Sequence, residues 1–174
     1  MLGLTSDAVA LVPHTELWHQ LFTEEAARLR AAAGAHFVAI EHVGSTSVCG
    51  LSAKPILDIA AAVRELADVG PCVAPLADLG YEYRGAAGIP GRRYFVKGEP
   101  RTHHLHVAEW RGDFWRTHLL FRDYLRRHAE AAAAYEALKR ELAQKYRTNR
   151  VAYTEGKAAF IEHFLRLAEA DAAG

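Results

Sequence analysis

The chain has 174 residues, of which 51% are hydrophobic, and its 21 Lys and Arg are balanced by 21 Asp and Glu. This length suits one domain with a substantial core, covering residues 1–174, and the hydrophobic content excludes a disordered chain. Zero net charge argues against extended nucleic acid as a partner, because nucleic-acid binding relies on many basic side chains that contact phosphates and are not neutralised by nearby acids. A small basic pocket for one nucleotide remains compatible with this balance.

The cysteine content and the N-terminal residues indicate a compartment. The chain contains two cysteines, Cys49 and Cys72, and begins with neither a secretory apolar segment nor a run long enough to cross a membrane. We therefore expect a cytoplasmic protein with no membrane partner. In such a reducing compartment both thiols are expected to be unpaired and to serve as small apolar filler in the core.

The first half of the chain predicts a helix followed by strands. Apolar residues at helical spacing predict an amphipathic helix over 15–33, which Gly34 ends. Strands are predicted over 36–43, 55–63 and 80–84, and the second of these is apolar on both faces, as expected for a central strand. Residues 64–79 are expected to be mostly helical, with a break at Gly70-Pro71.

The second half begins with a loop over 85–91 that is rich in glycine and is expected to be flexible. A hairpin is predicted next, with strands over 93–97 and 102–109 around Gly98-Glu99-Pro100. Helices are predicted over 114–128, 131–145 and 154–170. The order of helix, mixed sheet and helical C-terminal half predicts an α+β fold.

The most informative segment is Gly44-Ser45-Thr46-Ser47, which follows the predicted strand over 36–43. A strand that ends in Gly-Ser and enters a helical segment presents backbone N–H groups and the Ser45 hydroxyl to an anion, and Gly44 permits close approach. An ordinary turn with Ser45 as an N-cap is the alternative. Asp58 follows on the next strand. A Gly-Ser turn before an acidic strand resembles the start of a polymerase-β-like nucleotidyltransferase, although the second carboxylate would fall at Ala60.

Two histidines extend this candidate site. His104 and His106 share one face of the predicted strand over 102–109, whereas His103 points the other way and is expected to be structural. A carboxylate in an apolar strand needs a metal, an ion pair or a hydrogen bond to a turn, so Asp58 is a candidate third ligand. Two imidazoles and one carboxylate suit Mn²⁺, Fe²⁺ or Zn²⁺ better than Mg²⁺. The imidazoles are alternatively general bases, substrate hydrogen-bond partners or satisfied core residues.

Basic residues gather around the glycine-rich loop and the hairpin. They are Lys54, Arg84, Arg92, Arg93, Lys97 and Arg101. Arg92 and Arg93 directly follow the loop, which suggests a lid over a polyphosphate. Lys157, on the last predicted helix, is a further candidate phosphate ligand. Solvation at the surface is the alternative for each of these side chains.

Taken in order, these motifs resemble the GrpB family, a branch of the nucleotidyltransferase-fold superfamily. The resemblance is carried by Trp18 and Phe22, the stretches 40–48, 50–51, 53–59 and 79–81, Gly91-Arg92, the stretches 103–107 and 121–126, Tyr153-Thr154, Lys157 and Phe160-Ile161. Cys49 departs from the family, which usually carries proline there. The resemblance implies a nucleotidyltransferase-like mixed sheet with flanking helices. It also implies that the His-x-His strand replaces the third carboxylate of related enzymes.

We therefore expect a metal-dependent transferase of nucleotidyl groups from ATP or a related nucleotide to a small acceptor. The expected catalytic and metal-binding residues are Asp58, His104 and His106, with Mg²⁺, Mn²⁺ or Zn²⁺ as the divalent metal. The expected nucleotide and phosphate ligands are Gly44, Ser45, Lys54, Arg92 and Lys157. Two alternatives are a phosphohydrolase or another ATP-using enzyme with a transition metal, and a nucleotide-binding module without turnover. Ala60 favours the binding module, and the histidine pair favours an enzyme.

Overall fold

A five-stranded mixed sheet forms the centre of the computed structural model, which describes residues 2–5 and 8–173. The strands are β1 (Ala39–Val43), β2 (Leu57–Val63), β3 (Tyr81–Tyr83), β4 (Arg92–Lys97) and β5 (His103–Glu109). Their spatial order is β1-β2-β5-β4-β3, and β2 and β5 run parallel whereas the other neighbours are antiparallel. The sheet therefore brings β2 next to a strand that is distant in the sequence.

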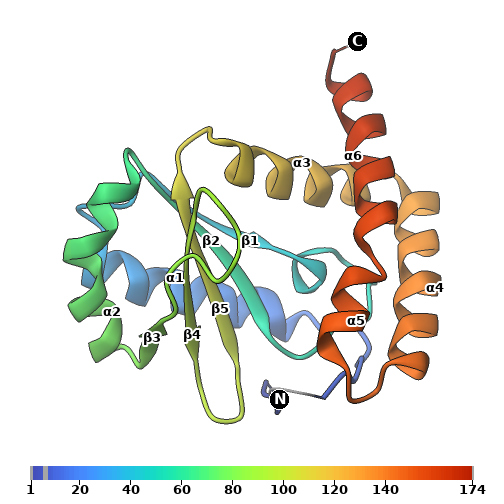
Figure 1. The fold of residues 1–174 in the computed structure, drawn as a ribbon, viewed down its shortest axis with the longest axis horizontal. Helices are drawn as coiled ribbons and strands as arrows, with labels where there is room; N and C mark the ends of the chain where they lie inside the picture. The colour runs from blue at the N-terminus through green and yellow to red at the C-terminus, as the bar shows by residue number, and fades with distance from the viewer. Residues whose placement is uncertain (1, 6–7, 174) are drawn as a thin grey trace.

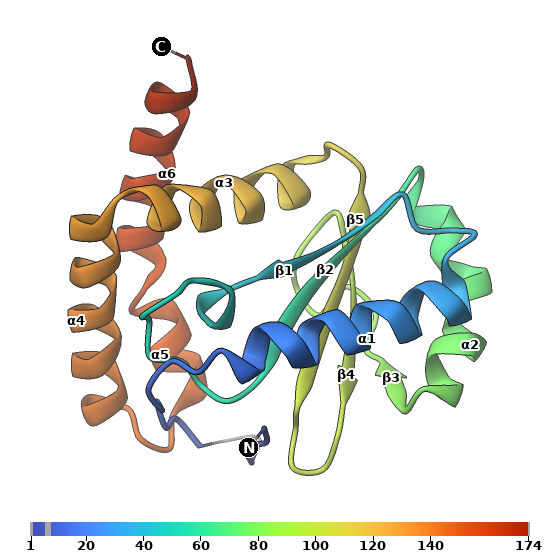
Figure 2. The same ribbon diagram turned by 180° about the vertical axis from the view of Figure 1, so that it is seen from behind.

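Helices cover the sheet and extend beyond it (Figures 1 and 2). They are α1 (Leu17–Ala33), α2 (Val73–Asp78), α3 (Asp113–Arg127), α4 (Ala129–Lys145), α5 (Arg150–Glu155) and α6 (Ala158–Ala173), with 3-10 segments η1 (Ser45–Ser47) and η2 (Leu66–Cys72). The helices α1 and α2 lie on one face of the sheet, and α4 to α6 form a helical half beside it. None of the described helices combines the length and apolar composition that a bilayer crossing requires.

Side chains alternate along β2, so one face of this strand belongs to the main apolar core and the other face belongs to the candidate site. Leu57, Ile59 and Ala61 point toward the main apolar core, where Trp18 and Leu29 of α1 are almost fully buried. The residues between them point to the opposite face, where Ala60 and Ala62 pack against Trp115 of α3. Asp58 lies on this second face. Its neighbours Leu57 and Ile59 are packed in the core on the first face, and this packing fixes the strand that carries the carboxylate.

The predicted α+β order and the central position of β2 are confirmed, although strands β1, β2 and β3 are shorter than predicted. The predicted helical region over 64–79 is η2 followed by the short α2. The single helix predicted over 154–170 is wrong, because α5 and α6 are separate helices on either side of 156–157. Gly156 packs so closely on α4 that a Cβ there would lie 2.7 Å from the Leu142 side chain. This break places Lys157 at a helix junction.

A buried ion pair fastens α1 to the far strands of the sheet. The Glu25 side chain is only 1% exposed, and its carboxylate accepts hydrogen bonds from Lys97 Nζ at 2.6 Å and from the Tyr81 hydroxyl at 2.9 Å. Burial favours the protonated carboxyl, but the Lys97 hydrogen bond and charge outweigh it and lower the pKa of Glu25. Lys97, one of the basic residues grouped around the hairpin, thus serves the core.

We predict that Glu25→Ala lowers the free energy of unfolding by about 3 kcal/mol, because it leaves the partners of a buried pair unmatched. Since the pKa of Glu25 is lowered on folding, its contribution is present above the unfolded pKa and is lost as pH falls through the folded value. Denaturant titrations at neutral and acidic pH measure both effects. Glu24→Ala is the control, because that side chain is 62% exposed and lies 4.0 Å from Arg28. Equal losses in the two variants would contradict the assignment.

Candidate functional site

A cavity of about 350 Å³ lies between the open face of the sheet and the helical half. The residues expected to be catalytic, metal-binding or phosphate-binding all line it: Gly44, Ser45, Lys54, Asp58, Arg92, His104, His106 and Lys157. They come from the ends of β1 and β2, from β4 and β5, and from the junction of α5 and α6. The fold thus brings together segments that lie far apart in the sequence.

The parallel pairing of β2 with β5 builds the centre of this cavity. It sets Asp58 beside His104 and Ala60 beside His106. Asp58 Oδ1 lies 2.8 Å from His104 Nδ1 and 3.7 Å from His106 Nε2. Ala60, the residue paired with His106, has a small side chain. The His106 imidazole therefore has room to lean along the sheet face toward Asp58, two residues away on β2. The carboxylate therefore lies between two imidazoles.

Each imidazole also faces an arginine, which fixes its tautomer. Arg150 Nη2 lies 3.3 Å from His104 Nε2, and Arg92 Nη1 lies 3.4 Å from His106 Nδ1. Because a guanidinium only donates hydrogen bonds, these ring nitrogens are acceptors. The ring protons accordingly lie on His104 Nδ1 and His106 Nε2, the nitrogens turned toward Asp58. On each side of Asp58, an arginine contacts a neutral imidazole, and that imidazole in turn contacts the Asp58 carboxylate. We call this arrangement the relay.

The charge states follow from burial and these contacts. Burial favours a neutral Asp58, but the hydrogen bonds and charges of His104 and His106 outweigh it and hold the pKa of that carboxyl well below its usual value. Burial lowers the pKa of both imidazoles despite Asp58, and the charges of Arg150 and Arg92 act in the same direction. At neutral pH an anionic carboxylate lies between two neutral rings.

The same three side chains fit a divalent cation by their chemistry. Their ligand atoms lie within 4.8 Å of one another, and one carboxylate with two imidazoles suits Mn²⁺, Fe²⁺ or Zn²⁺. A cation in this position takes the place of the ring protons that face Asp58. Each ring would then carry its proton on the other nitrogen, so Arg150 and Arg92 would have to leave the imidazoles. Metal binding here would therefore depend on where these two guanidinium groups point.

Positive charge exceeds negative charge around the cavity. Lys54, Arg92, Arg150 and Lys157 line it, and among the described lining residues Asp58 is the sole carboxylate. Burial and the charges of Arg150 and Lys157 lower the pKa of Lys54 to about 8. Burial also lowers the pKa of Lys157, with Arg150 adding to the effect. Because these ammonium groups are partly desolvated and Asp58 is the one carboxylate among several cations lining the described cavity, a bound anion would be stabilised there.

An aromatic ring positions both lysines, and apolar side chains complete the cavity. Lys54 Nζ lies 5.6 Å and Lys157 Nζ 4.6 Å from the centre of the buried Tyr153 ring. Further lining is aromatic or aliphatic and includes Phe121, Leu125, Tyr135, Ile161 and Leu165. The cavity therefore combines a basic surface with an apolar one, as a ligand with an anionic part and a flat organic part requires.

Gly44 is needed for close packing against Asp58. Its φ of 69° and ψ of −173° belong to a region that is essentially restricted to glycine, and a Cβ would lie 2.7 Å from Asp58 Oδ2. The helical segment that follows is only the 3-10 turn Ser45–Ser47, so no long helix dipole stands behind it. The Ser45 side chain faces the Tyr135 hydroxyl inside the cavity. The observed contact of Gly44 is thus with the carboxylate.

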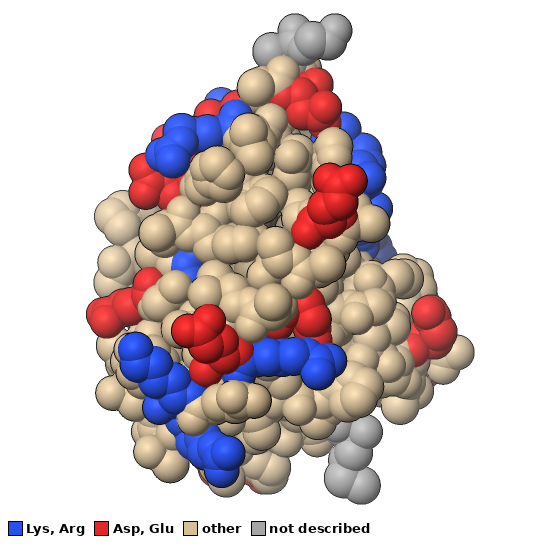
Figure 3. Space-filling model, turned by 90° about the vertical axis from the view of Figure 1, so that its right-hand side faces the viewer, with Lys and Arg blue, Asp and Glu red and all other residues tan. Residues whose placement is uncertain are grey.

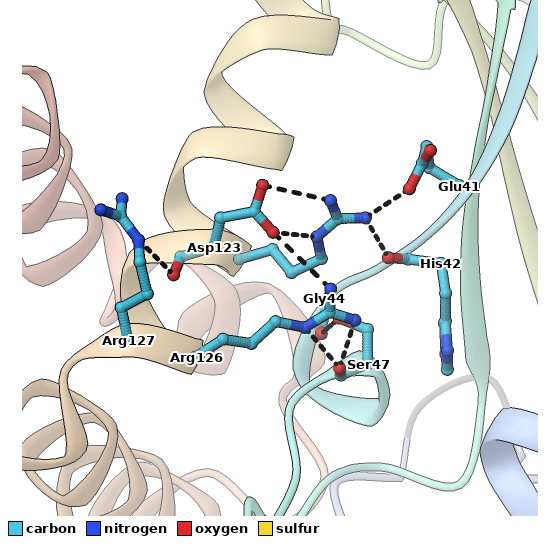
Figure 4. A network of polar contacts seen from close by, with 8 residues as sticks. Glu41, His42, Gly44, Ser47, Asp123, Arg126 and Arg127 are labelled. Carbon is cyan, nitrogen blue, oxygen red and sulfur yellow. Dashed lines mark hydrogen bonds and ion pairs between the residues drawn. The ribbon is translucent and has the colours of Figure 1, made fainter. Parts of the chain in front are cut away.

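Two arginines of α3 hold this turn by hydrogen bonds to its backbone and to the strand before it (Figure 4). Arg122 donates to the Glu41 carboxylate at 2.7 Å and to the His42 carbonyl at 2.9 Å. Arg126 donates to the Ser47 carbonyl at 2.7 and 3.1 Å. Asp123 accepts from Arg122 at 2.7 Å. Arg122 also lines the cavity, but its charge is compensated by these two carboxylates, so its role is to hold the turn.

Both expected lid arginines lie on strand β4. Arg92 belongs to β4, is 6% exposed, and donates to the carbonyls of Ala86 at 2.9 Å and Ala87 at 3.1 Å. Its guanidinium stacks 4.5 Å from the centre of the Tyr94 ring. Arg92 thus anchors the glycine-rich loop while it lines the cavity. Arg93 does not line the cavity in the described structure, because neighbouring residues of a strand point to opposite faces.

Several other residues of the sequence prediction lie away from the site. Arg84 pairs with Glu82 at 2.6 Å on the surface, and Arg101 pairs its backbone with Leu4. His103 points to the core face, as predicted, where its ring packs against Tyr81. Both cysteines are unpaired, as predicted, and Cys72 is buried. The core role predicted for Cys49 is wrong, because this residue follows η1 on an exposed turn.

Several further residues of the site were not predicted from the sequence. Tyr94, Tyr153 and Arg150 all line the cavity, as does His118, which stacks on Phe114 at 3.9 Å. The hairpin register pairs Tyr94 with His106, so alternation along the predicted hairpin contained a signal for Tyr94. Arg150 begins a six-residue helix that the predicted single helix did not include, so no periodic pattern marked it.

We predict that Gly44→Ala destabilises the protein by about 1–3 kcal/mol and also displaces the Asp58 carboxylate, since it combines backbone strain with a steric clash. Gly50→Ala is the matched control, because Gly50 also has a positive φ, of 79°, but a Cβ there would meet nothing within 4 Å. Denaturant unfolding measures the stabilities, and the imidazole NMR signals of His104 and His106 report the site. Undisturbed signals in Gly44→Ala would contradict the close-packing role.

Comparison with known proteins agrees with this architecture. The model of the GrpB protein family matches residues 8–166. The glutamate-rich protein GrpB of Alkalihalophilus pseudofirmus is 37% identical over 171 residues, covering 95% of this chain and 98% of that protein. The crystal structure of conserved protein GrpB from Enterococcus faecalis superposes with a TM-score of 0.88 at 35% identity, covering 95% of this chain and 100% of that chain.

A more distant structure relates the fold to a polymerase. The Cid1 poly(U) polymerase, solved with MgGTP bound, superposes with a TM-score of 0.52 at 10% identity, covering 76% of this chain and 44% of that chain. This likeness concerns the fold alone. The chain belongs to the GrpB family and has a nucleotidyltransferase-like α+β fold.

Proposed function

We propose that this protein binds ATP or a related nucleotide in the cavity and transfers a nucleotidyl group to a small-molecule acceptor. The observation that carries the proposal is the excess of half-buried positive charge around one carboxylate: Lys54, Arg150 and Lys157 line the same cavity as Asp58. A polyphosphate supplies the missing negative charge. The nucleotidyltransferase-like fold and the MgGTP of the Cid1 structure support the choice of a nucleotide.

In this proposal the cations of the cavity hold the phosphates. Lys54 and Lys157 supply two ammonium groups positioned by Tyr153, and the Ser45 hydroxyl supplies a further donor beside the Gly44 turn. Arg92 contributes mainly charge, because several of its donors already hold the loop carbonyls. The basic surface thus orients the polyphosphate relative to Asp58.

The divalent metal of the proposal is held by Asp58, His104 and His106. When bound, such a cation stabilises negative charge on phosphoryl oxygens and on an attacking oxygen. The neutral state of both imidazoles favours ligation, because a protonated ring has no lone pair to donate. Arg150 and Arg92, once they leave these rings, are close enough to the cavity to act on the phosphates.

A nucleotide-binding module without turnover is a second candidate, and two observations favour it. Ala60 occupies the place where a second carboxylate was expected, and it lies beside His106 in the sheet. Asp58 already accepts a hydrogen bond of 2.8 Å from His104, so the three side chains satisfy one another without a metal. A module of this kind would use the same basic surface to sense a nucleotide.

Turnover of labelled ATP with mixed small acceptors, in Mg²⁺ and then in Mn²⁺, separates the candidates. Label on an acceptor supports the transferase, whereas release of labelled nucleoside phosphates without an acceptor product indicates a phosphohydrolase. Binding without any product indicates the module. Asp58→Asn is the control for contaminating activity, since it preserves the shape of the side chain and removes its charge. Failure to bind ATP in the wild type, with or without metal, would overturn the proposal.

We predict that ATP affinity falls as pH rises through about 8, because Lys54 loses its proton there. The loss of one charge-assisted contact corresponds to about 1.5–3 kcal/mol, or at least tenfold in affinity. Calorimetric titrations at a series of pH values measure the profile. Lys54→Arg keeps its charge throughout this range and should flatten the profile. A profile of unchanged steepness in Lys54→Arg would show that another group is responsible.

We also predict that the wild type retains Mn²⁺ or Zn²⁺ at the Asp58 site, and that Asp58→Asn, His104→Ala and His106→Ala each lose most of that affinity. Because the pKa of both imidazoles is lowered, affinity should persist below the ordinary histidine value of about 6.5 and fall in more acidic buffer. Metal analysis of dialysed protein measures occupancy. If the wild type binds no metal here, with or without nucleotide, the cluster is a hydrogen-bonded relay and the variants lose only stability.

A further inference from the structure

A second set of metal-ligand side chains lies outside the cavity, on the other side of the Gly44 turn. His14, Glu16 and Cys49 have ligand atoms within 4.8 Å of one another. All three line a separate hollow of about 910 Å³, which shares the wall residues Thr46, Val48 and Leu125 with the cavity. We propose that these three side chains bind Zn²⁺.

The state of His14 is the first argument. Its side chain is 16% exposed, and within the described structure both ring nitrogens are buried without a hydrogen-bond partner. Nε2 lies 3.5 Å from Glu16 Oε1, and the ring packs edge-on against the buried Trp18 at 5.5 Å. Buried polar groups normally form hydrogen bonds, so an oriented imidazole that has none and lies 3.5 Å from a carboxylate is a ligand position that a cation would complete.

The backbone holds the three ligands together without a metal. Val12 N–H donates to the Ala53 carbonyl at 2.9 Å, and Ala53 N–H donates to the Val12 carbonyl at 3.0 Å. This pair aligns the segment before α1 with the segment that follows η1, and the two segments lie side by side in Figure 2. His14 and Cys49 are therefore brought close by the fold itself, and little conformational entropy remains to be lost when an ion binds.

The donor chemistry selects the ion. A soft thiolate, a borderline imidazole and a hard carboxylate together carry two negative charges; the thiolate and the imidazole match Zn²⁺ and disfavour Mg²⁺ or Ca²⁺. Glu16 is 80% exposed and Cys49 is exposed, so both can adjust to the ion from the solvent side. Three protein ligands leave a fourth position for water. Bound Zn²⁺ would fasten the start of α1 to the turn beside the proposed phosphate site.

Cobalt substitution tests this site separately from the Asp58 cluster, which contains no sulfur. Protein is loaded with Co²⁺ or Zn²⁺, and absorption and metal content are measured after dialysis. We expect a near-ultraviolet thiolate-to-cobalt charge-transfer band in the wild type and in Asp58→Asn, and its loss in Cys49→Ser. Zn²⁺ affinity should fall more than about 100-fold in Cys49→Ser and His14→Gln, since even outer partners of a metal site contribute 10–100-fold.

The controls make the outcome decisive. Cys72→Ser leaves the proposed site intact and should keep the charge-transfer band. Because Cys49 is exposed, Cys49→Ser is expected to fold, and circular dichroism verifies this. Absence of the band in Co²⁺-saturated wild type, or equal Zn²⁺ content in wild type and Cys49→Ser, would overturn the proposal. Loss of metal only in Asp58→Asn would assign metal binding to the cavity alone.

Discussion

The arrangement of the site depends on the parallel pairing of β2 with β5. This pairing places Asp58 beside His104, a residue 46 positions away in the sequence. Once the carboxylate is fixed there, the other contacts follow: His106 approaches over Ala60, and Gly44 packs against the second oxygen. A register shift of one residue would turn Asp58 into the apolar core, so the core packing of Leu57 and Ile59 protects the geometry of the site.

The chain is neutral overall but distributes its charges unevenly. On the face shown in Figure 3, basic and acidic side chains are intermixed among wide uncharged areas. The buried Arg122 is compensated by carboxylates, whereas the half-buried Lys54 and Lys157 lie near other cations. Partial burial and the neighbouring cations both lower the pKa of these lysines, so each factor disfavours their charged form. A bound anion would favour that form, which is why the cavity can select negative charge without a basic surface elsewhere.

Local patterns predicted the parts of the site that lie on strands. Alternation identified the shared face of His104 and His106, and an acid within an apolar run identified Asp58, because both signals depend only on period-two geometry. Arg150 could not be found this way, since its position depends on the break at Gly156. The sequence predicted that Arg92 lies near the site. The direction of its guanidinium group depends on the positions of the Ala86 and Ala87 carbonyls, which the sequence does not reveal. The exposure of Cys49 likewise depends on the tertiary path of the turn.

The relay around Asp58 links the two proposed occupants of the cavity. Without ligands, Arg150 donates to His104 and Arg92 to His106, which places the ring protons toward the carboxylate. A cation at Asp58 displaces those protons, and each arginine then needs another acceptor. Phosphate oxygens provide acceptors of the right charge in the same space. Each proposed occupant would therefore remove an obstacle to the other, and by linkage the coupling would be the same whichever binds first. Without ligands, Asp58, His104 and His106 are held by one another and by the two arginines, and these same contacts would make the proposed binding of metal and polyphosphate mutually dependent.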